Sequence, residues 1–552
     1  MKKRKIAAVV TAAMLLMTAC QSGSVSKDDE TEEETSRTEE SDKSEGGSGA
    51  GGLSGLINDI LNGETNNSSE PDTASAVPVE TTVSDDPDQP DAAETTAAST
   101  TASPDDDLYD EPNIAEMESL YQPSGNAGIV KYLGYYDITR DLKGYEQCLI
   151  FQSDMYGGTI EYISSPYGEA FYEKLSLYIA SDDSPDLVEK SVMLYPGNIS
   201  TNLFEPLDGK IDIDSPLWKD MKDVAESFSW GGNHYYYPHC ITTSFALNYS
   251  KKTIADNGLP DPYTLYMNGE WTWEAWREIM IRFCDMDEKN IGFYATDSTI
   301  NGFVLTTGTP WVDVLPNGHI TNNLQSSNVT RAMQFVESLY RDGLSYDKQY
   351  GDWVPPTVFA TNCDRLLFLC MEPEWTYIAA TETIQNSSGV ENDIFDTVSD
   401  FAFVPFPRDA YADAYYQGYE TFGYLIPKGA KNMSGALEFI NLNRAYEVDP
   451  VVQEHVRNDH IAPEKVYYTS GKYDGQQKWQ ITWGEQEYDL WKAMSDPANF
   501  TFVNEDAFGF SSEFQSELAA VVMDVVEDGA SWTQKSAQFS PVVDAMISQY
   551  YY

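Results

Sequence analysis

Side chains that could carry out catalysis are few in this chain, and they fall into no familiar catalytic motif. No His-Glu-x-x-His pair, Gly-x-Ser-x-Gly elbow or Walker loop is present. Glu372 and Glu374 could form the carboxylate pair of a retaining glycosidase, whose carboxyl groups lie about 5 Å apart. Because the chain contains 89 Asp and Glu residues, such pairs also arise by chance. We therefore expect no enzyme and no cofactor, with a secreted carbohydrate-active enzyme left open as an alternative.

Potential metal ligands are equally scattered along the chain. No CxxC pair or zinc-like cluster joins the five histidines to the cysteines, so we expect no metal site. The histidines are His234, His239, His319, His455 and His460. The cysteines after residue 20 are Cys148, Cys240, Cys284, Cys363 and Cys370. An odd number cannot all pair internally, so they are expected to be small buried residues, although Cys363 and Cys370 could still bridge.

Cys20 stands where a thiol could receive a lipid. A basic stretch precedes an apolar run over residues 6–17, and two small residues come directly before the cysteine. The run is shorter than the roughly 20 residues that span a membrane, so it predicts a signal peptide over residues 1–19. Its end resembles the bacterial lipobox, in which diacylglycerol is attached to the cysteine; an ordinary signal peptide is the alternative. We expect a protein on the extracellular face of a Gram-positive cell membrane, anchored through this lipid alone.

Residues 20–125 are expected to form a disordered tether. No Phe, Tyr or Trp occurs in residues 21–108, so this stretch has too little apolar surface to offset chain entropy. Residues 21–125 carry 27 acidic and 3 basic side chains, a net charge of −24, and repulsion should keep the tether extended. With 34 Lys and Arg against 89 Asp and Glu, the whole chain lacks the positive surface that binds nucleic acid.

From Tyr109 onward the composition is that of a globular protein, because all 12 Trp, 36 Tyr and 23 Phe lie there. The length of this part of the chain, residues 109–552, predicts two or more domains. Strands are expected at residues 128–135, 159–163 and 185–188, and helices at 142–156 and 167–180. Strands that alternate with helices are typical of βαβ units and parallel sheets, so the predicted fold class is α/β.

Two further helices are marked by residues that could cap their N-termini. Thr272 is expected to cap an amphipathic helix that continues over residues 276–283. Ser434 is expected to cap a helix that runs to Asn443, after a strand that ends at a Pro and Gly turn.

Several stretches together resemble the family 1 extracellular solute-binding proteins, which include maltose- and oligosaccharide-binding receptors of ABC importers. In order, they are DSPDLV at 183–188, FEPLD at 204–208, YYYP at 235–238 with LNYSK at 247–251, NGEWTW at 268–273, FVESLYRDG at 335–343, EW at 374–375 and IPKGAKN at 426–432. Each is a degenerate pattern, but their order and spacing agree with the family over residues 126–552.

The resemblance implies a two-lobed periplasmic-binding-protein-like fold of type II, with the ligand in the cleft between the lobes. Lobe 1 would take about residues 126–244 and 412–446, and lobe 2 about 247–405 and 450–552. The chain would then cross the hinge near residues 243–247, 406–413 and 445–450. Ligands of open α/β sheets lie outside the carboxyl ends of the strands, which places them in this cleft.

The resemblance also implies ligand-binding residues. Trp375 aligns with a position that stacks on sugar in family members, and sugar rings present apolar C–H faces to such side chains. Tyr136 and Asp137 end the first expected strand, where the family often has a ligand-facing loop.

Trp311 is a further candidate, in a loop expected to follow an apolar strand, and Glu420 lies in a segment that resembles a cleft-facing one. Relatives often carry a glycine-rich run at the position of Glu420. By contrast, Trp271, Trp273 and Trp276 match a family motif that is structural, so we leave them out of the site.

The function implied is capture of a carbohydrate, most simply an oligosaccharide, by cleft closure and its delivery to ABC permease subunits. The protein would act as a monomer and touch the membrane only through its lipid. A receptor for another solute, such as a peptide, and a structural surface lipoprotein without a small ligand stay open as alternatives.

Overall fold

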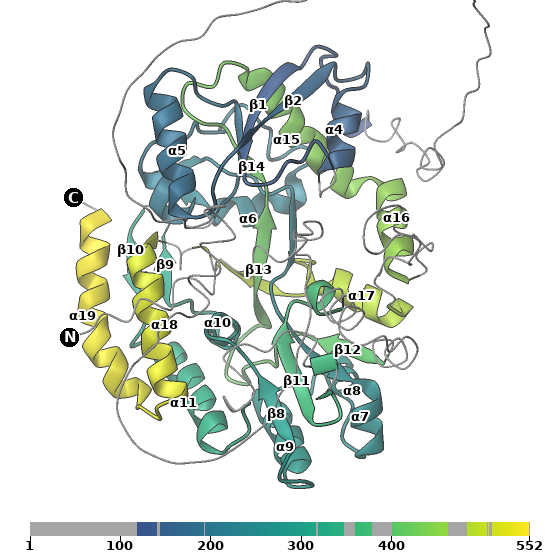
Figure 1. Ribbon diagram of the computed structural model, residues 1–552, viewed down its shortest axis with the longest axis vertical. Coiled ribbons are helices and arrows are strands. Elements are labelled where there is room, and N and C mark those ends of the chain that lie inside the picture. Colours follow the sequence, from purple (N-terminus) through teal and green to yellow (C-terminus); the bar gives the residue numbers. More distant parts are fainter. Residues whose placement is uncertain are drawn as a thin grey trace, which may run out of the picture. The chain divides into compact units, whose positions relative to one another are not determined.

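Figure 1 shows the computed structural model, which describes residues 119–140, 144–191, 194–315, 318–346, 359–360, 362–377, 400–461, 483–504, 506 and 510–550. The predicted signal peptide, Cys20 and the predicted tether up to residue 118 lie outside these residues. No helix in the described ranges combines the length and the apolar character needed to cross a membrane.

The first sheet contains the strands expected at the start of the globular region. Its strand order is β14-β3-β1-β2, with β1 Gly128–Gly134, β2 Gly158–Ser164, β3 Leu187–Glu189 and β14 Tyr424–Leu425. β1 pairs in parallel with β2 and β3, and β14 runs antiparallel to β3. The strands predicted at 128–135 and 159–163 are confirmed, while β3 begins two residues after the predicted start at 185.

Helices connect these parallel strands, as the alternation predicts. They are α4 Tyr145–Phe151 and α5 Glu169–Ala180, and α15 Met433–Val448 packs against β1 and α4. The prediction of one helix over residues 142–156 is wrong, because α4 ends at Phe151. The chain then turns into β2 through hydrogen bonds from the Tyr156 and Gly157 amides to the Ser153 carbonyl (3.2 and 2.8 Å).

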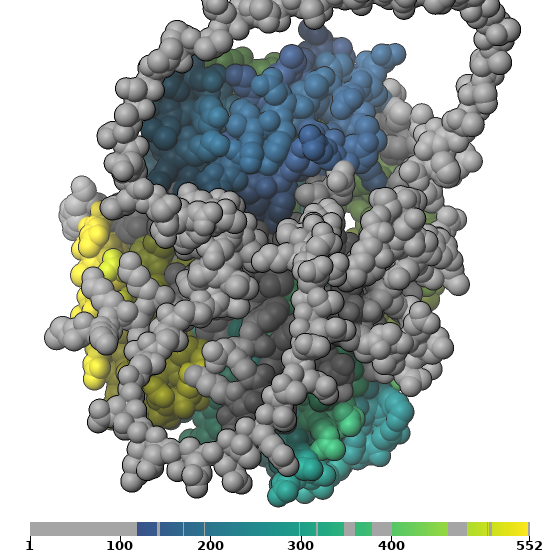
Figure 2. Space-filling model, in the orientation of Figure 1, coloured from purple at the N-terminus to yellow at the C-terminus, as the bar shows by residue number. Residues whose placement is uncertain are grey.

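Around this sheet lies the first core, a cluster of buried apolar side chains from residues 127–237 and 419–445. Aromatic rings dominate its interior, where Phe439 of α15 contacts Phe151 and Tyr424. The blue part of the chain, which encloses the first core, forms a continuous surface in Figure 2.

The second sheet has the order β12-β7-β11-β8. Its strands are β7 Ala246–Ser250, β8 Ile291–Tyr294, β11 Leu366–Met371 and β12 Phe401–Val404. β11 is parallel to β8 and antiparallel to β7, and every residue of β7, β11 and β12 is buried. A buried strand of this kind is a continuous apolar run, as the sequence LLFLCM of β11 is.

The second core surrounds this sheet, with buried apolar residues from 246–406 and 483–547. Its helices are α7 Lys251–Asp256, α8 Pro262–Met267, α9 Trp273–Cys284, α10 Asp297–Leu305, α11 Ser327–Arg341, α16 Pro450–Ile461, α17 Glu485–Met494, α18 Ser512–Val526 and α19 Trp532–Tyr550.

Short elements complete both regions. Before residue 237 they are η2 Leu194–Asn198, η3 Lys219–Met221, α6 Lys222–Glu226, β4 Ser229–Trp230 and β5 Asn233–His234, and after residue 246 they are β9 Val312–Val314 and β10 Ile320–Asn322.

A small third sheet lies where the chain passes between the two cores. Its order is β15-β13-β6, with β6 Cys240–Thr243, β13 Tyr416–Phe422 and β15 Thr501–Val503. The chain leaves the first core after residue 237 and enters the second at 246, returns between 406 and 419, and leaves again after 445. Lys190 joins β13 to the segment after β15, because its ammonium group bonds both Thr421 and Asp506 at 2.7 Å.

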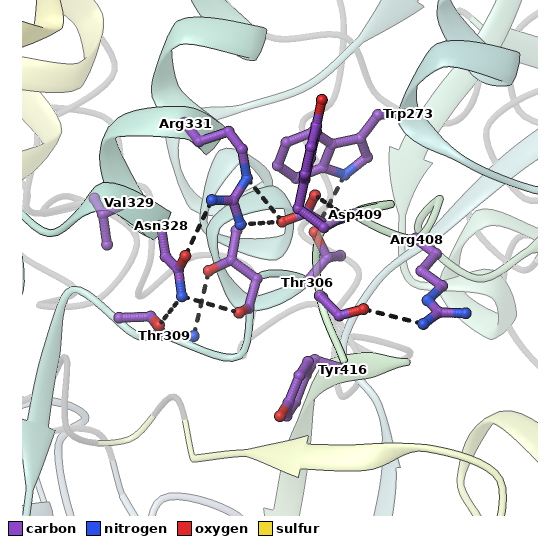
Figure 3. A network of polar contacts seen from close by, with 12 residues as sticks. Trp273, Thr306, Thr309, Asn328, Val329, Arg331, Arg408, Asp409 and Tyr416 are labelled. Carbon is purple, nitrogen blue, oxygen red and sulfur yellow. Dashed lines mark hydrogen bonds and ion pairs between the residues drawn. The ribbon is translucent and has the colours of Figure 1, made fainter. Parts of the chain in front are cut away.

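The returning segment is held to the second core by a buried polar network (Figure 3). The Asp409 carboxylate is fully buried and pairs with the Arg331 guanidinium of α11, whose Nε lies 3.1 Å from Oδ2. Arg331 also donates to Asn328 Oδ1 at 3.0 Å, and the Asn328 amide donates to Thr309 at 2.9 Å. This network fixes the backbone next to β13.

The two predicted helix caps have different outcomes. Thr272 does cap α9, since its hydroxyl accepts from the Ala275 amide. Ser434 does not cap α15, because Asn432 occupies that position and accepts from the Gly435 amide at 3.0 Å. The Asn432 side-chain amide also donates to the Ala127 and Ile129 carbonyls at 2.7 and 2.8 Å, and a serine hydroxyl has only one O–H to donate.

The possible Cys363–Cys370 disulfide is not formed, and the five cysteines within the described residues are all free. Cys370 is fully buried inside β11, whereas Cys363 lies in the turn before that strand. The extended stretch from Leu366 to Cys370 alone covers about 13 Å, and a disulfide needs Cα atoms within about 7 Å.

Candidate ligand-binding site

Three tyrosines gather beyond the carboxyl ends of β1 and β2. The ring of Tyr135, directly after β1, lies 4.3 Å from the ring of Tyr136 and 5.0 Å from that of Tyr167, centroid to centroid. Gly134, the last residue of β1, leaves room for the buried Tyr132 side chain, because a Cβ atom there would lie 2.2 Å from the Tyr132 hydroxyl oxygen. All three rings are half-buried, so they form a partly open aromatic surface, the tyrosine cluster.

Carboxylates surround the tyrosine cluster. Burial, and then the neighbouring charge of Glu189, raises the pKa of Tyr135. Burial and then the charge of Glu420 on β13 raise the pKa of Tyr167 in the same way. Both phenols therefore stay protonated and can donate hydrogen bonds beside groups that can accept them.

Two hydroxyls near Glu420 are buried without a hydrogen-bond partner among the described residues. One is Tyr167 Oη, and the other is Thr242 Oγ1 of β6, whose residue pairs with Glu420 across the β6–β13 ladder. A buried hydroxyl without a partner costs free energy, so a polar group of a ligand would be stabilised there.

The second core contributes the turn after β11. The Glu372 carboxylate accepts hydrogen bonds from the Glu374 and Trp375 amides and so caps the short helix 373–377. Burial, then the charge of Glu374, and also that of Glu420 raise the pKa of Glu372 well above its usual range. The charge of Glu420 thus acts on both Glu372 and Tyr167, while the half-buried Trp375 ring packs against the second core.

An ion pair fixes the helix that carries Trp375. His460 Nε2 of α16 lies 2.9 Å from the Glu374 carboxylate, and its ring packs between the rings of Trp483 and Trp491. Burial lowers the pKa of His460, but the hydrogen bond and charge of Glu374 outweigh it, so the pKa is raised.

Comparison with known proteins decides the family. Residues 148–446, more than half of the 552-residue chain, match the model of the bacterial extracellular solute-binding proteins. The chain belongs to this family. No curated protein sequence is similar enough to this solute-binding protein to count as a match.

Solved structures of bacterial binding proteins share its fold. The sugar-binding protein MalE of Xanthomonas citri has a TM-score of 0.53 at 14% identity, covering 76% of this chain and 98% of its own. The GacH receptor of Streptomyces glaucescens, solved with acarbose, has 0.51 at 15%, covering 76% and 98%. UgpB of Mycobacterium tuberculosis, solved with glycerophosphocholine, has 0.52 at 16%, covering 77% and 100%.

These findings confirm the predicted family resemblance and the periplasmic-binding-protein-like α/β fold. The family consists of binding proteins that act outside the cytoplasm on small solutes, and the two-core structure has the architecture of that class.

The structure brings some predicted site residues of this solute-binding protein together. Tyr136 belongs to the tyrosine cluster and the charge of Glu420 acts on Tyr167, whereas Trp375 lies on the turn after Glu372 and packs against the second core. Asp137 is next to Tyr136, but its carboxylate accepts from the Thr139 amide and hydroxyl and pairs with Arg140 at 3.0 Å, so it stabilises a local turn.

Trp311 lies elsewhere. Its ring is 3% exposed and packs 5.4 Å from Trp532 within the second core. The apolar segment before it was expected to be a strand but forms helix α10, which begins with a capping box between Thr296 and Thr299. After the end of α10 the chain turns at Gly308, whose φ is 77°, and Trp311 enters the second core.

Sequence reasoning missed Tyr135, Tyr167, Glu189 and Glu372 as site residues. A signal existed for Tyr167, since it follows the second expected strand as Tyr136 follows the first, and parallel strands end at one edge. In the sequence, Glu372 stands out only as a carboxylate pair with Glu374, and nothing in the local pattern indicates the influence of Glu420, which lies 48 residues further along the chain.

A separate hollow of about 460 Å³ lies against the first core alone, beside Asp208, His234 and Tyr237. His234 is held there by Asp208 at 2.8 Å and Glu226 at 2.9 Å. A ligand in this hollow would contact the first core only, whereas the tyrosine cluster belongs to the first region and Trp375 to the second.

Proposed function

We propose that this protein is the substrate-binding lipoprotein of a bacterial ABC importer that captures a carbohydrate, most simply an oligosaccharide. The observation that carries the proposal is the tyrosine cluster, in which the half-buried Tyr135 ring lies 4.3 Å from Tyr136 and 5.0 Å from Tyr167, beside the charges of Glu189 and Glu420. Aromatic rings suit the apolar faces of sugar rings, and carboxylates with protonated hydroxyls suit the sugar hydroxyl groups.

The mechanism we propose is closure of two lobes around the solute. The first and second cores would be these lobes, with bounds close to residues 126–244 and 412–446, and 247–405 and 450–552. A solute that touches Tyr136 and Trp375 at once would bind the closed form better than the open one, and only that difference in affinity can shift the equilibrium. The closed monomer would then deliver the solute to the permease subunits without chemical change.

A second candidate is a receptor for a cationic or zwitterionic solute. Three tyrosine rings beside Glu189 and Glu420 would also suit a quaternary ammonium group, through cation–π attraction and charge. The structural neighbour UgpB was solved with glycerophosphocholine, whose choline group has this chemistry.

A thermal-shift screen tests both candidates. A saccharide that binds only the folded state should stabilise the protein by about 2.7 kcal/mol at a concentration of 100 Kd. The screen should contain mono- and oligosaccharides, dipeptides and choline esters, and the saccharide hit should be chromatographed after overnight incubation. A hit from the choline esters alone would replace the sugar proposal, and cleaved product would make the protein an enzyme.

The proposed anchor at Cys20 predicts where the protein is found in cells. Cys20→Ala should move it from the membrane fraction to the medium, because the lipid would be its only attachment. Cys284→Ala, a change in a half-buried cysteine of the second core, is the control and should stay with the membrane. A Cys20→Ala protein that remains with the membrane would reveal a different anchor.

A further inference from the structure

Three side chains with metal-binding atoms meet at the edge of the first core, away from the tyrosine cluster. His239 and Cys240 stand at the start of β6, and Glu447 lies in the last turn of α15. One ligand atom from each lies within 4.8 Å of the other two. This group was not predictable from sequence spacing, since Glu447 lies about 200 residues after His239 and Cys240.

The backbone that carries His239 and Cys240 is firmly held. The His239 amide donates to the Phe422 carbonyl at 2.8 Å, and Cys240 pairs with Phe422 in the β6–β13 ladder. The His239 ring stacks on the ring of Tyr424, with 5.6 Å between centroids and 23° between planes. Two of the three donors are thus positioned before any ion arrives, which lowers the entropy cost of binding.

Burial and charge at this place also suit a cation. His239 is 7% exposed, while Cys240 and Glu447 are half-buried, so an ion could enter from the side of these two. Arg444 donates to the His239 carbonyl at 2.8 Å, and its charge is paired with Asp220. The charge of Arg444 is therefore partly neutralised and should oppose a cation bound by Glu447 and Cys240 only weakly.

We propose that His239, Cys240 and Glu447 bind a thiophilic divalent cation of the Zn²⁺ type. Imidazole nitrogen, thiolate sulfur and carboxylate oxygen are the three zinc ligands of proteins, at about 2.0, 2.3 and 2.0 to 2.2 Å. On binding, the Cys240 thiol releases its proton to solvent, and thiolate and carboxylate together balance the two charges of the ion. A fourth position stays open for water, so the ion should exchange more readily than in a closed four-ligand site.

The bound cation would tie the first strand that leaves the first core to the end of α15, just before the chain leaves that core again. It should therefore stabilise the region where the chain passes between the cores. This inference does not depend on which solute the protein captures.

Cobalt substitution tests the site in the full-length protein. Chelator-treated protein should bind one Co²⁺ with a near-ultraviolet charge-transfer band from the thiolate, and Zn²⁺ should displace it. Cys240→Ser should abolish the band. Glu447→Gln should weaken Zn²⁺ binding by about 100-fold, since even outer partners of metal ligands are worth about 10- to 100-fold. The controls Cys284→Ser and Glu454→Gln, which alter a distant cysteine and an exposed carboxylate on α16, should leave band and affinity unchanged.

Alkylation of the wild-type protein provides a second readout that needs no variant. Zn²⁺ should protect Cys240 from alkylation and leave Cys284 reactive, as peptide mass mapping would show. The proposal is wrong if the wild type gives no thiolate band, if Cys240→Ser keeps the band, or if Zn²⁺ fails to protect Cys240. Should Cys240→Ser not fold, the alkylation result and Glu447→Gln decide the question.

Discussion

Aromatic side chains gather in two regions of this protein, and their environments differ between the two. In the second core, Trp276 is fully buried and its ring lies 5.1 Å from Phe303 and 5.2 Å from Phe293. In the tyrosine cluster, Tyr135 and Tyr167 are only half-buried and lie beside carboxylates. An aromatic-rich composition alone therefore does not reveal a sugar site.

The polar atoms of the rings separate the two regions less sharply than burial does. The indole N–H of Trp271 donates to the Pro405 carbonyl at 2.8 Å, and that of Trp273 to the Thr306 hydroxyl at 3.2 Å. Among the described residues, however, the buried indole N–H of Trp276 has no hydrogen-bond partner, and neither has the Tyr167 hydroxyl. What distinguishes Tyr167 is its partial exposure and the nearby charge of Glu420.

The largest effect that this contrast predicts is on folding. Trp276→Ala should lower the free energy of unfolding by about 3 to 5 kcal/mol, because it removes a fully buried ring and leaves a cavity among phenylalanines. Urea unfolding followed by circular dichroism would measure it. Tyr411→Ala removes a ring that is 78% exposed, so its loss should stay near 1 kcal/mol or less. Equal losses in the two variants would contradict the assignment of Trp276 to the core.

Trp311 tests the contrast at a residue that the sequence placed in the site. Since its ring packs on Trp532, Trp311→Ala should cost about 3 kcal/mol of stability and leave the affinity of the refolded protein for its solute unchanged. Calorimetric unfolding and a binding titration on one preparation give both quantities. A variant that melts normally but no longer binds the solute would show that Trp311 belongs to the ligand-binding site.

Trp311 also shows how far sequence reasoning reaches. The strands β1 and β2 and the cap at Thr272 were predictable because each depends on a local pattern. The apolar run before Trp311 fits a strand or a helix equally well, and only the capping box at Thr296 distinguishes them.

The candidate site was predictable only in part, for a related reason. Tyr136, Glu420 and Trp375 came from a family resemblance, not from spacing. The fold brings the charge of Glu420 to act on Tyr167, which lies 253 residues earlier in the chain, and on Glu372, which lies 48 residues earlier. No local pattern carries that information.

Trp375 should show the opposite behaviour to Trp311. Trp375→Ala is expected to weaken solute binding by about 1 to 3 kcal/mol, a range typical of aromatic stacking on nucleic-acid bases, with little change in the melting temperature of the empty protein. Trp375→Phe keeps a ring and should recover part of the affinity. Normal binding by a Trp375→Ala variant that melts much lower would make the residue part of the second core.

The smallest effect concerns one hydroxyl group, and a matched pair of tyrosines isolates it. Tyr167→Phe keeps the ring contact with Tyr135 and removes the unpartnered hydroxyl, so affinity for the solute should fall by about 0.5 to 1.5 kcal/mol while stability stays the same or rises. Tyr172→Phe is the control, because the Tyr172 hydroxyl is buried and donates to the Ser191 carbonyl at 3.1 Å. It should lose about 0.5 to 1.5 kcal/mol of stability and bind normally. If instead Tyr167→Phe destabilises the protein and leaves binding intact, its hydroxyl serves the fold, and the tyrosine cluster is a second aromatic core rather than a ligand surface.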